Sequence, residues 1–170
     1  MEILDKSKPL SEEEYEEKMI EAFVQKPEKF DYYKRAFKKF NVNGIERIAW
    51  HWSWWGFFFE FWFLLYRKAY IGALISFLGG ILLGLIPFFG PLIWMILNGG
   101  YDVYFIYKKY KKLKNEIEMK VSDPYQRIET MYILAKPNTW VIWVVAIISI
   151  LSLLGFFAVV ISGSYNDYNY

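Results

Sequence analysis

Three long apolar runs constrain this chain more than any other feature. They cover residues 69–86, 88–107 and 140–161, which are 18, 20 and 22 residues long. An α-helix needs roughly 20 apolar residues to cross about 30 Å of hydrocarbon. Asp102 is the one charged residue within the three runs. The runs predict three transmembrane helices in an all-α integral membrane protein, with a membrane domain over residues 45–161.

An aromatic segment, Ile48–Tyr66, precedes the first run and holds five of the eight tryptophans. Aromatic rings with a polar edge prefer the membrane–water boundary. The segment is long enough to cross a membrane, but it contains Glu60, and a charge at mid-span costs at least a few kcal/mol. We therefore expect an interfacial or re-entrant helix over residues 48–66 that enters and leaves on one side.

The basic residues predict the orientation. None of the 20 lies in the 87–91 turn or after Ile161. If the aromatic segment does not cross, every basic residue lies on the cytoplasmic side, as the positive-inside rule requires. A crossing segment would place one group of basic residues outside. We expect a multi-pass inner-membrane protein with a cytoplasmic N-terminus and a periplasmic C-terminus.

Residues 1–44 predict a cytosolic pair of amphipathic helices after a loose tail over residues 1–10. Ser11 and Glu14 form a capping-box pattern that opens a helix over residues 12–25. A second helix, over residues 28–40, has an aromatic stripe and a basic opposite face. Two arrangements remain open for this helix: it lies on anionic lipid, or it packs against the acidic first helix.

The second cytosolic segment covers residues 108–136. The preceding span is expected to continue as a helix to about Lys120, and Asp123-Pro124 predicts the start of a short helix over residues 124–135. The polar tail over residues 162–170 is expected to be disordered or weakly ordered.

Small residues recur at every fourth position of the first span. Gly72, Ser76, Gly80 and Gly84 form a ridge that lets another helix approach closely, from a partner or from a second copy.

Three polar residues inside the apolar segments are candidate functional residues: Glu60, Asn98 and Asp102. For Glu60 we favour an ion pair or snorkelling over proton or ion handling. Arg67 lies two helical turns away, too far for a direct pair, so a bend before Arg67 or contact with another helix would have to bring a cation close. Asn98 and Asp102 share a helix face, which favours interhelical hydrogen bonding over a polar pathway.

Basic and tyrosine side chains flank the spans and predict contacts with lipid headgroups. The candidates for anchoring are Tyr66, Arg67, Lys68, Tyr70, Lys108 and Lys109. A lysine run can also bind nucleic acid, but this one directly follows a span, so anionic lipid is the expected partner and nucleic acid is not.

The sequence carries no recognisable catalytic signature. It has no cysteine, and the single histidine, His51, lacks neighbours at metal-ligand spacing. Nucleotide-binding glycine motifs and nucleophile motifs are also absent. We expect His51 to be an interfacial side chain, and we expect no enzyme activity, catalytic residue, cofactor or metal.

The run from Trp52 to Tyr70 resembles a family of small bacterial inner-membrane proteins known as domain of unknown function 2628. The family carries the block W-x-W-x-x-F-F-F-x-x-x-W-x-L-Y-R-K-M-Y, and the similarity covers about residues 30–107. This chain has Ala69 where methionine is usual, and Glu60 where a small or neutral residue is expected. The resemblance implies a multi-span membrane protein and supplies no catalytic residues.

These features together predict a non-catalytic scaffold or accessory subunit that binds other membrane proteins and anionic lipid. The alternative is an oligomeric transporter or pore subunit that uses Glu60, Asn98 and Asp102. A lipid-modifying enzyme using His51 and Glu60 is the least favoured hypothesis, because no nucleophile or metal cluster accompanies them.

Overall fold

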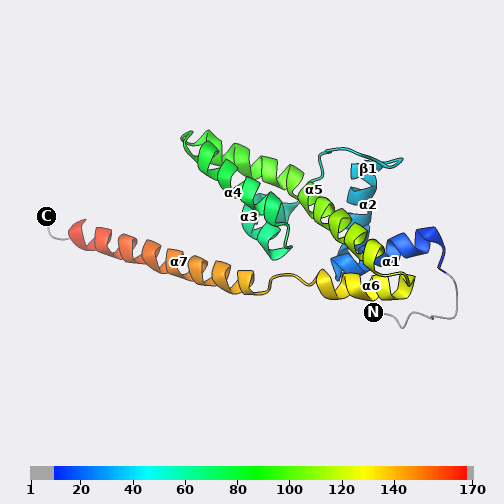
Figure 1. Ribbon diagram of the computed structural model, residues 1–170. Helices are drawn as coiled ribbons and strands as arrows, with labels where there is room; N and C mark the ends of the chain where they lie inside the picture. The colour runs from blue at the N-terminus through cyan, green and yellow to red at the C-terminus, as the bar shows by residue number, and fades with distance from the viewer. Residues whose placement is uncertain (1–9, 168–170) are drawn as a thin grey trace. The chain divides into compact units, whose positions relative to one another are not determined.

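A computed structural model describes the backbone of residues 10–167 and the side chains of residues 10–161. The described chain is almost entirely helical, with seven α-helices, as the sequence predicts (Figure 1). It divides into two compact units, Met1–Pro137 and Asn138–Tyr170. The predicted loose tail over residues 1–10 and the last three residues of the predicted polar tail lie almost wholly outside the described residues.

The first two helices match the predicted amphipathic pair. Helix α1 (Glu12–Val24) starts at the expected capping box, in which Ser11 Oγ accepts from the Glu14 amide and the Glu14 carboxylate accepts from the Ser11 amide. A 3-10 turn, η1 (Pro27–Lys29), leads into α2 (Phe30–Phe40). The aromatic stripe of α2 is buried and Lys34 pairs with Glu17 of α1. The structure therefore has the packed helical pair, not a helix with its aromatic rings in lipid.

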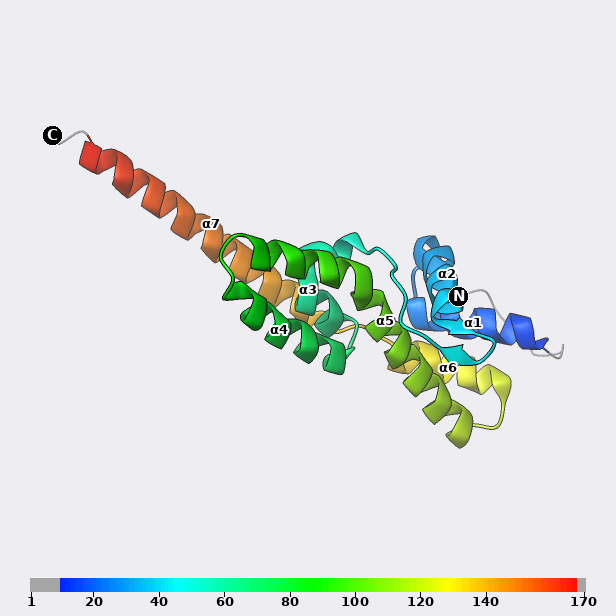
Figure 2. The same cartoon turned by 90° about the horizontal axis from the view of Figure 1, so that it is seen from above.

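Helix α5 (Phe89–Lys120) runs unbroken through 32 residues, as the sequence predicts. Its C-terminal half packs with α1, α2 and α6 (Pro124–Leu134), and we call this assembly the helical head (Figure 2). Phe37 stacks on Tyr110 with ring centroids 4.9 Å apart, and Phe23 meets Tyr110 edge-on at 5.2 Å. Asp123 caps α6 by accepting from the Gln126 amide at 2.8 Å, with Pro124 at the first helical position.

The connection from the head to the aromatic segment is a short antiparallel pair, β1 (Asn41–Val42) and β2 (Ile45–Glu46). Glu46 joins this pair to α5, because it accepts hydrogen bonds from Tyr104, Lys108 and Lys111 at 2.7 to 2.9 Å. The hydrogen bond from Lys108 contributes most to lowering the pKa of Glu46 from 4.5 to about 2, with Lys111 and Tyr104 adding to it.

The aromatic segment differs from the expected helix over residues 48–66. Residues 48–53 are not helical, and helix α3 (Trp54–Tyr66) begins only after Ser53, whose hydroxyl accepts from the Gly56 amide at 3.2 Å. The reason is tertiary. The amides of His51 and Ser53 donate to the carbonyls of Gly100 and Gly99 on α5, at 2.9 and 2.7 Å, and so these amides do not serve a helix.

Helices α4 (Tyr70–Gly84) and α5 form an antiparallel hairpin, against which α3 packs (Figure 2). The hairpin turns through residues 85–88, where Phe88 has a positive φ of 63°. At the turn, the carbonyl of Leu83 lies against Gly90 so closely that a side chain there would collide with it.

Helix α7 (Trp140–Asp167) forms the second unit. Residues Trp140–Ile161 are long and apolar enough to cross a membrane, and the other described helices do not meet that criterion. The three predicted spans are therefore not confirmed: α4 has only 15 residues, and the apolar part of α5 is interrupted by polar residues. The helical backbone of α7 also continues to Asp167, into the tail that was expected to be disordered.

The hairpin turn provides the first prediction. Gly90→Ala should lower the free energy of unfolding by about 3 kcal/mol or more, because the added methyl meets rigid backbone. The matched control is Gly84→Ala, where an added methyl meets nothing within 4 Å. Unfolding in detergent micelles, followed by tryptophan fluorescence, measures both. Equal stability of the two variants would contradict the tight turn.

Glu46 provides the second prediction. A carboxylate with a lowered pKa stabilises the fold above pH 4.5, and this contribution is lost as the pH falls from 4.5 to about 2. Glu46→Gln should cost about 1 kcal/mol at neutral pH, since partial exposure screens the charges. The variant should also lose less stability than the parent between pH 4.5 and 2, measured by acid titration of the unfolding midpoint. Parallel pH profiles would exclude this role of Glu46.

Candidate functional site

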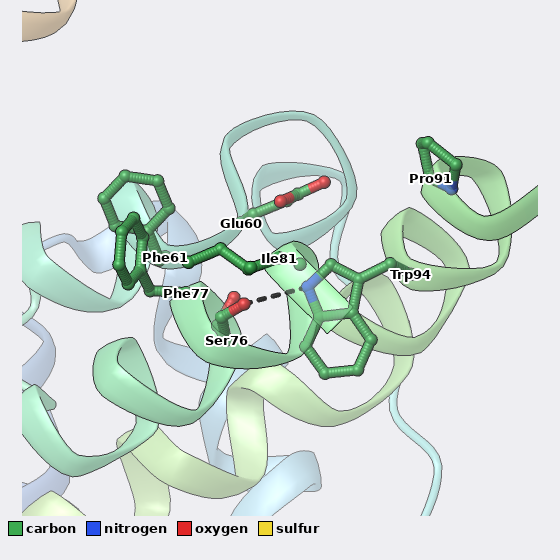
Figure 3. A pocket seen from close by; sticks show the side chains of 8 residues that line it. Glu60, Phe61, Ser76, Phe77, Ile81, Pro91 and Trp94 are labelled. Carbon is green, nitrogen blue, oxygen red and sulfur yellow. Dashed lines mark hydrogen bonds between the residues drawn. The ribbon is translucent and has the colours of Figure 1, made fainter. Parts of the chain in front are cut away.

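Four buried polar side chains lie beside the middle of the α4–α5 hairpin. Ser53, Ser76, Asn98 and Asp102 are each no more than 5% exposed. Glu60 lies close by on α3, where it lines a pocket of about 270 Å³ together with Ser76 and Trp94 (Figure 3). Sequence reasoning grouped Asn98 and Asp102 on one helix face and joined Glu60 to them only in the pore alternative; the fold brings all three to one region.

Asn98 forms the predicted interhelical hydrogen bond, and its partner is Ser76. The Ser76 hydroxyl and Asn98 Oδ1 are 2.5 Å apart, and Asn98 Nδ2 donates to the Trp94 carbonyl at 2.8 Å. The Trp94 indole N–H donates to the Ser76 carbonyl at 2.9 Å (Figure 3). The Ser76–Asn98 and Trp94–Ser76 bonds join α4 to α5, and Asn98 uses both its amide oxygen and its amide nitrogen in bonds within the protein.

Asp102 is buried against α3. A methyl group placed on Gly56 would lie 3.0 Å from Asp102 Oδ2 and 2.9 Å from the Asn98 carbonyl, so α3 and α5 approach closely at this point. Oδ2 of Asp102 has no hydrogen-bond partner within the described chain. Leaving a buried polar atom unpaired is costly, and Asp102 is therefore an unusual residue in this packing.

Glu60 bends α3. Its backbone has φ 42° and ψ −124°, which divides the helix into two arms. The side chain is half-buried and receives no cation from the described residues. The bend brings no cation to Glu60: the Arg67 guanidinium lies over the Tyr33 ring at 5.0 Å and reaches the Val24 carbonyl at 3.4 Å.

The contacts of α3 show that the helix first runs toward the hairpin turn and then returns toward the helical head. Gly56 in its first arm lies beside Asn98 and Asp102, and the bend at Glu60 approaches Gly80 and the Trp94 pocket, nearer the hairpin turn. Arg67, just after the second arm, is back beside the helical head. The two arms therefore lead away from the head-side end of the hairpin and back, and the placement of this segment at a membrane stays a prediction.

The small-residue ridge of α4 is occupied by the chain itself. Gly72 faces Phe105, Ser76 bonds Asn98, and Gly80 faces Trp94, all on α5. Gly84 has nothing within 4 Å of an added methyl. The ridge permits close helix packing, and α5 occupies three of its four positions; packing of a partner or a second copy on this ridge stays a prediction.

The predicted lipid anchors divide into two groups. Arg67 is engaged inside the protein, and Lys108 pairs with Glu46. Tyr70 is 56% exposed, and Lys68 and Lys109 have no ion-pair partner among the described residues. Tyr66 is partly buried. Lipid anchoring remains a prediction, carried best by Lys68, Tyr70 and Lys109.

His51 lies within an aromatic cluster. Its ring is 4.6 Å from that of Tyr32 and 6.3 Å from that of Phe40, and its Nε2 has no described hydrogen-bond partner. Burial lowers the pKa of His51, and the nearby charges of Lys39 and Arg35 lower it further. The described residues contain no group of three histidine or acidic side chains that could hold a metal ion.

Sequence reasoning missed two structural roles. Trp50 and Trp52 pack their rings on Gly100 and Gly99, respectively. The glycine pair was expected to allow close approach, but the approaching segment was not identified. Glu46 was missed as well, since its partners lie more than fifty residues further along the chain.

Comparison with known proteins gives no match to a family model, to a curated protein or to a solved structure. The resemblance of the aromatic segment to the family named above stays a prediction.

The bend at Glu60 provides the third prediction. Glycine in a helix interior is about 1 kcal/mol less favourable than alanine, but at a positive φ the order reverses. Glu60→Gly should therefore be more stable than Glu60→Ala, by about 1 kcal/mol. Both variants remove the carboxylate, so their difference isolates the backbone. Chemical unfolding in micelles measures it, and a more stable alanine variant would show an unbent helix.

Proposed function

We propose that this chain is a non-catalytic scaffold or accessory protein of a bacterial inner membrane, which holds the helical head at the cytoplasmic face. The observation that carries this proposal is the segregation of exposed side chains. Apolar side chains are exposed along the hairpin, including Ile71, Leu74, Leu78, Leu82, Leu85, Phe88 and Ile93, and along α7. Contiguous exposed apolar surface of this extent marks an interaction with membrane or protein.

Charge supports the orientation. Between Lys68 and Asp102 the chain has no charged residue, whereas the helical head carries the ion pairs Lys34–Glu17, Lys111–Glu46 and Lys114–Glu16. With the hairpin and α7 in lipid, every basic residue lies on one side, which is the cytoplasmic side by the positive-inside rule. In this arrangement α7 crosses the membrane and the C-terminus is periplasmic.

The polar residues support a scaffold better than a pore. Ser76 and Asn98 satisfy each other across the α4–α5 contact, and Gly56 closes over Asp102. A pathway along Glu60, Asn98 and Asp102 requires these contacts to open. The packed head offers exposed helix faces of α1, α5 and α6 to a partner, and its core holds them in fixed positions.

The fourth prediction is that the protein prefers anionic lipid. In nanodiscs, tryptophan quenching by brominated phosphatidylglycerol should exceed quenching by brominated phosphatidylcholine. Lys68→Gln with Lys109→Gln should lower this ratio several-fold, because each lysine near an anionic surface contributes about 1 kcal/mol.

The matched control is Lys112→Gln with Lys120→Gln, which makes the same change of charge further along α5 in the head. This control should leave the quenching ratio unchanged. An equal effect of both double variants would indicate non-specific attraction, and no lipid preference in the parent would contradict the anchoring role. Release of the protein from membranes by alkaline carbonate would contradict membrane insertion altogether.

A further inference from the structure

We propose that the α4–α5 hairpin enters the bilayer and returns without crossing it, so that its tip, residues 85–91, contacts lipid acyl chains. This inference rests on the membrane insertion proposed above and goes beyond it, because it assigns the tip to the hydrocarbon and not to the far aqueous side.

Aromatic and basic side chains near Tyr101 indicate the level at which the hairpin meets water. The Trp50 ring meets the Tyr101 ring at 5.2 Å, and the Trp50 carbonyl accepts from the Lys39 ammonium at 2.6 Å. A lysine head group and an indole at the same level are characteristic of the membrane–water boundary. We therefore take this level as the point where the hairpin leaves water.

The hairpin is short from that level. The rise from Tyr101 back to Phe89 is about 18 Å at 1.5 Å per residue. Helix α4, with 15 residues, spans about 22 Å. The hydrocarbon layer is about 30 Å thick, so the hairpin ends inside it.

The tip has the surface of a segment that stays in lipid. Leu85 is 77% exposed, Phe88 92% and Phe89 70%, and residues 85–91 contain no polar side chain. A turn that emerges into water usually carries polar residues. This turn presents its largest apolar side chains outward instead.

Most backbone N–H groups of the tip are paired within the protein, as an environment without water requires. A backbone polar group left unpaired in hydrocarbon costs several kcal/mol, so a tip in lipid requires that its N–H groups find partners within the protein. The amides of Leu85, Ile86, Phe89 and Gly90 all donate to carbonyls within residues 82–87, at 2.7 to 3.4 Å. Pro87 and Pro91 have no N–H at all. Phe88 is the one amide of residues 85–91 with no described acceptor.

The fifth prediction uses the absence of cysteine from the chain. Phe88→Cys introduces a single thiol at the tip, and the change removes little packing because the Phe88 side chain is exposed. The control is Met119→Cys, at an exposed position near the end of α5 in the helical head. Both full-length variants are treated with a membrane-impermeant maleimide in inside-out and right-side-out vesicles.

The tip thiol should react at least about ten-fold more slowly than the control from either side, because an apolar surrounding suppresses the reactive thiolate. An environment-sensitive dye attached to the purified Phe88→Cys protein should be quenched by lipids brominated on the acyl chains after reconstitution. Met119→Cys should react in inside-out vesicles.

Two outcomes would overturn the inference, and they separate it from the proposed function. Fast reaction of Phe88→Cys only from the side opposite to Met119→Cys would show that the hairpin crosses, while membrane insertion would stand. Fast reaction of both thiols from the same side would show that the hairpin does not insert, and the proposed function would fail with it.

Discussion

The close approach of the aromatic segment to Gly99 and Gly100 is the contact on which the hairpin half of this fold depends. Two backbone hydrogen bonds and the rings of Trp50 and Trp52 occupy the space that side chains at those positions would fill. The contact holds residues 48–53 extended along α5, and it thereby fixes where α3 begins. From that start, α3 covers Asp102 and brings Glu60 to the face of α4.

Helix α5 joins this half to the helical head. Its first part supplies Trp94, Asn98 and Asp102 to the hairpin, and its second part supplies Tyr107, Tyr110 and Leu113 to the core of the head. A single helix serves both halves because its buried positions continue from Asn98 to Ile117, while its exposed side chains change from apolar to charged. The ion pairs of Lys111 with Glu46 and of Lys114 with Glu16 then join β2 and α1 to the charged part of α5.

Much of this fold follows from local sequence. The capping box of Ser11, the Asp123-Pro124 start and the long helix α5 are set by short-range chemistry, and the structure contains all of them. Residues 48–53 and the bend at Glu60 are set by contacts with α5 and α4, far away in the sequence, and periodicity alone predicts an unbroken helix there. The same limit applies to Glu60 itself: local spacing places Arg67 too far away for a direct pair, and whether a bend brings the two together depends on the fold, which takes Arg67 to Tyr33. The glycine ridge illustrates a third case, in which the packing property was predicted but its partner lies within the chain.

The bent course of α3 has a consequence for the surrounding lipid. Three helices lie together as far as the bend at Glu60, which shares a pocket with Ile81 and Pro91, and only α4 and α5 continue to the turn, where Gly84 has no neighbour within 4 Å of an added methyl. In the membrane arrangement proposed above, a body of this form would take up more lateral area in the cytoplasmic leaflet than in the opposite one. A bilayer relieves unequal leaflet areas by bending, convex toward the more crowded leaflet. A taper placed in this way would act on membrane curvature without any moving part.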